Sequence, residues 1–446
     1  MLSRVMAALF QEWLLRWANI KAGRDVRPRA PRRHGRAVVT NAEVALDQLD
    51  RRIDEQLGAV LRNPRLLELE GAWRGLHRLL AAIDGHERVK LQLLHATKQE
   101  VADDSLSGSQ ALTALIVDEP FMEERPEPFG AIIGDYIWHD ATSDAAVLRN
   151  LAVQVAAAHI PFLSGAGAEF FAPTHGKVPS EIWLALRDAH ESRYIFLAGP
   201  RVLARTPRDP QGTEAYCWTN AAYLVGEALV GAVLRDGSGA GIDAPDGLVH
   251  VDGLVIHPDV NTNRPSGTEV PVNPKLAKDL AKLGLMPLST GSGKVGTFYG
   301  LGSVNRPPHF DRPMAAHNAR ISVLLPYISV VNALLLPMMV QARDGLRRGL
   351  AADELEMQLR RWLSGLCMAR NLGDEALAFP LWDSNVQVLE DPARPGKYRL
   401  GAYIAPRMPM HDLNISMRVM AKVPDPKARL SSPEAPPFSA GHGAQS

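Results

Sequence analysis

The chain has 446 residues, of which 46% are hydrophobic, 22% charged and 6% aromatic, so it encodes a folded protein with a large core and not a disordered one. Lysine and arginine total 49, as do aspartate and glutamate, and this balance favours neither nucleic acid nor an anionic membrane surface as a partner. The two cysteines, Cys217 and Cys367, form no paired motif, which excludes a disulfide framework and a zinc finger.

The N-terminal segment predicts an amphipathic helix over residues 1–23, because apolar residues recur there at three- and four-residue steps around Leu9, Trp13 and Trp17. Gln11 interrupts its apolar run and no cleavage site follows, so we expect no export signal. The helix could pack on its own domain, lie on a membrane or bind a partner. Residues 24–40, rich in arginine and proline, predict a basic linker.

Residues 41–100 predict a helical hairpin that binds a partner. The first helix ends before Asn63, and the second starts with Asn63 as its N-cap and Pro64 as its first residue. The apolar positions expected to contact the partner lie on both helices: Leu46, Leu49, Ile53, Leu57, Trp73 and Leu76.

Residues 101–390 predict a mixed α+β or α/β body, because helical patterns alternate with short apolar strands there. Strands are expected at 89–95, just before this body, and at 129–138 within it, and an irregular β-rich insertion near 231–302, where glycine and proline are frequent. The longest apolar segment, 323–340, contains Pro326 and Pro337 with several polar residues, so we expect no transmembrane span.

The C-terminal part predicts a β-hairpin over 391–424, since apolar and polar residues alternate in 413–423 after a first extended run at 398–405. Residues 425–446 lack periodicity and predict a disordered tail. The hairpin positions expected to contact neighbouring subunits are Tyr398, Leu400, Ile404, Leu413, Ile415, Met417 and Val419.

Motifs for catalysis are weak in this chain. The run at 291–294 lacks the remaining residues of a phosphate-binding loop, and no serine or cysteine lies in a nucleophile motif. One group has residue types that suit a metal, although solvated polar side chains are the simpler interpretation: His250, Asp252, His257 and Asp259. We therefore expect no catalytic residue, no cofactor and no metal.

An ordered series of motifs carries more information. It resembles the large subunit of the contractile sheath of type VI secretion, and the similarity spans roughly residues 41–424. The matching motifs are LEGAWRGL at 69–76, FG with GDY at 129–136, SRY at 192–194, PRVLAR at 200–205, WTN at 218–220, GTE at 267–269, LPY at 325–327 and PGKY at 395–398.

The resemblance implies a phage tail sheath-like fold and a structural, cytoplasmic role in bacteria. The partners that it implies are the small sheath subunit in a heterodimer, other sheath heterodimers, the inner tube protein, the baseplate and an AAA+ unfoldase that recycles the sheath. It also implies that the C-terminal β-hairpin exchanges strands with neighbours, so proline at Ile415 or Val419 is expected to prevent long tubes. The N-terminal helix, through Leu9, Trp13 and Trp17, is the expected recognition element of the unfoldase.

One segment departs from the family pattern. Residues 331–339, VNALLLPMM, replace an expected arginine-, histidine- and aromatic-containing motif. The chain is therefore either a principal sheath protein or a divergent paralogue with a second large subunit as a further partner. Two other classes of function stay open at this point: a metal-dependent enzyme that uses the histidine and aspartate group, and a membrane-docking adaptor that uses the N-terminal helix.

Overall fold

The computed structural model describes residues 41–108, 111–118, 128–171, 180–205, 216–243, 247–258, 265–290, 294–367, 381–390, 397–406 and 417–423. Contacts divide the chain into a unit of residues 1–57 and a unit of residues 58–446. The predicted N-terminal helix, the basic linker and the C-terminal tail lie outside the described residues, as do five predicted site residues: Leu9, Trp13, Trp17, Leu413 and Ile415.

Helix α2 (Asn41–Leu61) supplies the described part of the first unit and crosses its boundary. Its apolar residues Leu46, Leu49 and Ile53 are 59%, 53% and 51% exposed, and Leu57 is half-buried. The helix thus forms where the apolar periodicity predicts it, with its apolar stripe open to solvent. The hairpin arrangement with the next helix stays a prediction.

The second unit contains a six-stranded sheet with the order β1-β2-β3-β9-β10-β6. The first four strands are parallel, and β9, β10 and β6 pair in antiparallel fashion. Parallel strands need both faces covered, which agrees with β2 and β3 being buried at every position. The strands are β1 (Ile132–Trp138), β2 (Phe162–Ala166), β3 (Ile195–Gly199), β6 (Val249–Val251), β9 (Met286–Thr290) and β10 (Gly296–Phe298).

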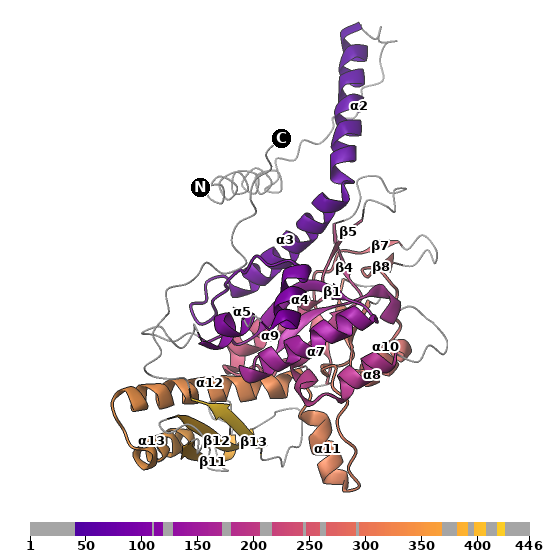
Figure 1. The fold of residues 1–446 in the computed structure, drawn as a ribbon. Coiled ribbons are helices and arrows are strands. Elements are labelled where there is room, and N and C mark those ends of the chain that lie inside the picture. The colour runs from indigo at the N-terminus through magenta and orange to yellow at the C-terminus, as the bar shows by residue number, and fades with distance from the viewer. Residues whose placement is uncertain are drawn as a thin grey trace. The chain divides into compact units, whose positions relative to one another are not determined.

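Helices α7 and α8 connect the first three strands, and α9 packs against β1, β2 and β3. Helix α3 packs in turn on α9 and on the small β4-β5 sheet, as can be followed in Figure 1. The helices of this part are α3 (Pro64–Ile83), α4 (Lys98–Ser107), α5 (Ala111–Thr113), the π-helical turn η1 (Ala114–Asp118), α7 (Thr142–Ala157), α8 (Glu181–Asp188), α9 (Ala222–Asp236) and α10 (Pro274–Lys282).

Short elements complete the body around this sheet. Two antiparallel pairs lie outside it, and two 3₁₀ turns flank α8. They are β4 (Val202–Arg205) with β5 (Cys217–Thr219), β7 (His257–Pro258) with β8 (Pro265–Ser266), and the turns η2 (Ala168–Phe170) and η3 (His190–Tyr194).

The C-terminal part consists of α11 (Pro313–Ile321), α12 (Leu325–Arg347), α13 (Ala352–Gly365) and a three-stranded antiparallel sheet. The strands are β11 (Leu381–Glu390), β12 (Tyr398–Pro406) and β13 (Met417–Lys422), paired in that order. Helix α13 packs on β11, and α12 packs on α13, β12 and β13.

Helix α12 is long and apolar enough to cross a membrane, with a mean hydropathy of 1.5 over its most apolar window. However, 78% of that window is buried inside the body, and Tyr327, Leu325 and Met338 are fully covered. A long apolar helix that is mostly covered by protein is typical of the core of a folded domain.

Three sequence-based expectations need correction. Residues 89–95 form no strand, since none of the described strands pairs with them, and Leu93 and Leu94 are both exposed. The part around 231–302 is not an insertion, since it supplies β6, β9 and β10 of the main sheet. The expected C-terminal hairpin forms between β12 and β13, but it belongs to a three-stranded sheet, because β11 also pairs with β12.

Candidate partner-binding surfaces

Two glycines of the LEGAWRGL motif bring α3 into close contact with its neighbours. A Cβ atom at Gly71 would lie 2.1 Å from the Trp218 carbonyl oxygen, and one at Gly75 would lie 2.3 Å from the Tyr223 ring. The two positions are four residues apart and therefore share one helix face. Only glycine allows this approach, so the motif fixes how α3 packs on β5 and α9.

The glutamate of the same motif joins α3 to β4. Arg205 donates from Nε to Glu70 Oε1 at 2.8 Å and from Nη2 to Oε2 at 2.9 Å, and Arg74 Nε donates to Oε1 at 2.8 Å. Burial raises the pKa of Glu70, but the hydrogen bonds from the two arginines outweigh it and hold the pKa below its ordinary value. The carboxylate is thus a charged, doubly paired anchor.

Other motifs meet in the same way. Arg201 of PRVLAR donates to Glu269 of GTE through two hydrogen bonds of 2.8 and 2.5 Å. Asn220 of WTN donates to the Tyr136 carbonyl of GDY at 3.0 Å and accepts from the Ala222 amide at the start of α9 at 2.9 Å. These motif residues therefore join separate elements of the fold.

The outer side of α3 carries an exposed apolar stripe, defined here as Leu69, Trp73 and Leu80. Their side chains are 52%, 41% and 46% exposed. At about 100° per residue the three positions fall within an arc of about 40°. Leu76, which the sequence predicted as part of the interface, is only 8% exposed and packs into the body, so we leave it out of the stripe.

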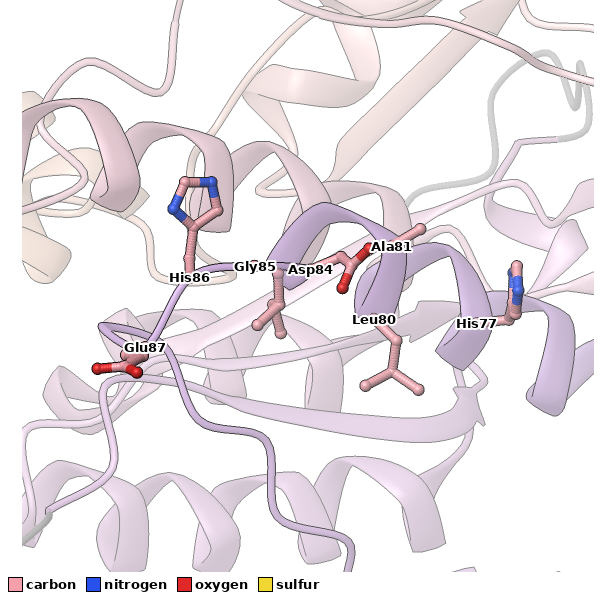
Figure 2. Close-up of a pocket in the computed structure, with 8 residues that line it drawn as sticks. His77, Leu80, Ala81, Asp84, Gly85, His86 and Glu87 are labelled. Atoms are coloured by element: carbon pink, nitrogen blue, oxygen red, sulfur yellow. The ribbon is translucent and has the colours of Figure 1, made fainter.

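The stripe ends at an open depression of about 710 Å³ where α3 meets the following turn. Figure 2 shows His77 and Leu80 on the helix, with Asp84, His86 and Glu87 along the turn. Both apolar and ionisable side chains line it, a composition that suits a protein partner.

The C-terminal sheet has one buried and one exposed face. Leu400 and Ile404 are 0% and 1% exposed and contribute to the core, so they are corrected as candidates for side-chain contact with a neighbour. Tyr398 is half-buried, and Tyr403, which the sequence analysis did not select, is 44% exposed beside Asn385. The alternation of Val386 and Val388 with the polar residues Asn385 and Gln387 is a signal that could have revealed β11.

The backbone register shows which β13 groups serve the sheet itself. The Val423 amide donates to the Tyr398 carbonyl at 3.0 Å, and antiparallel ladders alternate in direction at each residue. Residues Met417, Val419 and Ala421 therefore bond to β12, and Arg418, Met420 and Lys422 direct their N–H and C=O groups outward. Proline at Val419 would consequently damage the sheet itself, contrary to the sequence-based expectation.

The proposed metal group is not assembled in the described part of the chain, where no cluster of three or more histidine, cysteine, aspartate or glutamate side chains could hold a metal ion. His250 lies on β6 with its Nδ1 atom 3.2 Å from Thr297 Oγ1, and Asp252 follows the strand in an exposed position. The side chain of His257 and all of Asp259 lie outside the described residues.

Comparison with protein families decides between the remaining candidate functions. Residues 43–305 match VipB, described as EvpB/VC_A0108, tail sheath N-terminal domain, and residues 314–423 match the tail sheath gpW/gp25-like domain of the same group. The chain belongs to this family. It is the large subunit of the type VI secretion contractile sheath, a non-enzymatic component of a cytoplasmic bacterial structure, as the motif series predicted. This assignment replaces the two alternative functions, a metal-dependent enzyme and a membrane-docking adaptor.

A curated bacterial relative agrees with this assignment. The type VI secretion system sheath protein TssC1 of Pseudomonas aeruginosa is 25% identical over 434 residues, which cover 87% of each chain. The baseplate structure of the anti-feeding prophage gives a TM-score of 0.35 at 13% identity, covering 62% of this chain and 65% of that one. The contracted sheath complex of the extracellular contractile injection system PVC gives 0.37 at 9% identity, covering 75% and 88%. The sequence match, and not these two structures, identifies the family.

Proposed function

We propose that this sheath subunit pairs with the small sheath subunit through the exposed stripe of α3, and that the heterodimers stack as helical rings around the inner tube on a baseplate. The observation that supports this pairing is the stripe itself: Leu69, Trp73 and Leu80 are exposed on a helix whose opposite side is tightly packed. Large apolar side chains that share one face of a fixed helix are typical of protein interfaces. The exposed apolar residues Leu46, Leu49 and Ile53 of α2 are proposed to contact the small subunit as well.

Co-expression with the small subunit tests the pairing. Leu69→Asp is compared with Val153→Asp, because Leu69 and Val153 are 52% and 54% exposed on helices of the same body. We expect Leu69→Asp to weaken co-purification by at least about tenfold and Val153→Asp to leave it unchanged. Equal behaviour of the two variants would refute the assignment of the stripe.

Electron microscopy of the co-purified wild-type complex tests assembly. Long tubules would show that the chain is a principal sheath subunit. Stable heterodimers that form tubules only after a second large subunit is added would identify it as a divergent paralogue. Failure to bind the small subunit at all would refute the proposed heterodimer.

We propose further that the C-terminal sheet links neighbouring subunits by accepting a strand along β13. Proline lacks an N–H group and is tolerated at positions where that group faces outward from an edge strand. Met420→Pro should therefore spare the heterodimer and abolish long tubes, whereas Val419→Pro should disrupt the sheet of the subunit itself. Normal tubes from the Met420→Pro variant would contradict the linkage.

The N-terminal helix is proposed as the element that the AAA+ unfoldase recognises when it recycles the sheath. It carries Leu9, Trp13 and Trp17 at helical spacing. Deletion of residues 1–23 should lower unfoldase binding in a pull-down while tubules still form. Unchanged binding after this deletion would exclude the helix as the recognition element.

A further inference from the structure

The two edges of the C-terminal sheet differ in their hydrogen bonding. The Val388 amide of β11 donates to the Glu356 carboxylate of α13 at 3.1 Å, so it points away from β12. Since the ladder alternates, Ser384 and Val386 also direct their backbone groups away from β12. These three residues, with Glu390 at the end of the strand, form the outer edge of β11.

Side chains already form hydrogen bonds with most of the backbone groups described along that outer edge. The Val386 carbonyl accepts from Arg360 Nη2 at 3.4 Å, and the same nitrogen donates to Glu356 Oε1 at 2.7 Å. The Ser384 amide donates to Asp383 Oδ1 at 2.8 Å, and the Val386 amide donates to Asn385 Oδ1 at 2.9 Å. The amides of Ser384, Val386 and Val388 thus each have an acceptor, and α13 packs on the strand.

The other edge lies along β13, at Arg418, Met420 and Lys422. Within the described residues no further strand pairs there, because the sheet order ends at β13. An edge with free N–H and C=O groups accepts an additional strand, whereas an edge covered by charged side chains resists one. Among the described residues, side chains thus cover the β11 edge, whereas no strand pairs with the β13 edge.

On the basis of the strand linkage proposed above, we propose that Glu356 and Arg360 of α13 act as an edge guard, which closes β11 so that a strand of a neighbouring sheath subunit pairs only along β13. The pair is partly exposed, with 28% and 52% of the two side chains accessible, and such surface pairs contribute little to folding stability. Removal of this pair should consequently uncover the strand edge with little change in the free energy of unfolding.

A helical sheath has a specific need for such a device. One strand per sheet makes a defined link between neighbours, whereas two equivalent edges would allow a second, wrongly placed connection. Proteins commonly prevent unwanted edge pairing with charged side chains and covering helices. Here the i, i+4 spacing places both members of the guard on the same side of α13.

Hydrogen exchange on wild-type protein provides the first test, with amides followed residue by residue in the free heterodimer and in assembled tubules. Assembly should slow exchange at Met420 by at least about tenfold and leave Val388 unchanged. New protection along β11 with none along β13 would overturn the proposal. Absence of any tubules would instead point to failure of the proposed sheath function.

A double variant, Glu356→Ala with Arg360→Ala, provides the second test. The matched control is Asp279→Ala with Lys282→Ala, which removes an exposed ion pair of 2.9 Å on α10 that lies on no strand edge. With the small subunit present, sedimentation should show extra self-association only for the first variant, together with slowed exchange at Val386 and Val388 in the associated species. Association equal to that of wild type and control would overturn the guard.

Discussion

Replacement of Gly71 by alanine tests how closely α3 must pack on the body. The new Cβ atom would lie 2.1 Å from the Trp218 carbonyl oxygen and 3.2 Å from its carbon. Both atoms belong to the backbone of β5, so no rotamer change relieves the contact. Either α3 or β5 must shift, and the Glu70–Arg205 hydrogen bonds that join α3 to β4 would be strained with them.

The expected loss follows from two opposing terms. Overpacking of a close contact costs about 1–3 kcal/mol, and a contact with backbone belongs at the upper end of that range. Alanine recovers about 1 kcal/mol relative to glycine through its helix propensity. The net effect is a destabilisation of about 2 kcal/mol.

Gly58→Ala is the matched control, because the same substitution there meets only the end of the Arg62 side chain, at 3.5 Å. Its expected effect has the opposite sign, a stabilisation of up to about 1 kcal/mol. Urea unfolding of the full chain, followed by tryptophan fluorescence, measures both. A Gly71→Ala protein within about 0.5 kcal/mol of wild type would show that α3 does not need this approach.

Three further measurements test individual contacts. Glu70→Gln should lower the free energy of unfolding by about 1–3 kcal/mol at neutral pH. The pKa of Glu70 is lowered in the folded state, so the stabilisation by its carboxylate is present above the ordinary glutamate pKa and is lost as the pH falls through the folded pKa. Urea titrations of wild type and variant should therefore converge in acid. Thr97→Ala removes the N-cap of α4, a capping box closed by Glu100, and should cost about 1 kcal/mol in thermal unfolding. Leu400→Ala should cost about 2–5 kcal/mol and the exposed Leu389→Ala less than about 0.5 kcal/mol; similar losses would contradict the assignment of the two sheet faces.

Local signals predicted the helices well. Asn63 accepts from the amides of Arg65 and Leu66, and Pro64 begins α3, so the boundary between α2 and α3 lies where the capping residues indicated it. The apolar segment that contains Pro337 forms a continuous helix despite its proline; most of the segment is buried, while Pro337 itself is exposed.

Long-range pairing was harder to predict. Residues 89–95 show an alternating pattern and yet form no strand, while β11 has a similar pattern and pairs with β12 along its length. Whether an extended segment becomes a strand depends on a partner that is distant in sequence. A similar limit applies on α3, where Leu76 lies within about 60° of Trp73 around the helix. Leu76 is nevertheless buried and Trp73 exposed, which depends on the neighbouring segments and not on the local sequence.

The edge guard shows this limit most clearly. In the sequence Glu356 and Arg360 are an ordinary i, i+4 pair on an amphipathic helix, indistinguishable from pairs that only face solvent. Their proposed role appears once β11 lies beside α13, because the same carboxylate then accepts from Val388 while it holds Arg360 against Val386. A sequence pattern indicates which segments can form strands, but the position of α13 beside β11 determines which strand edge its side chains cover.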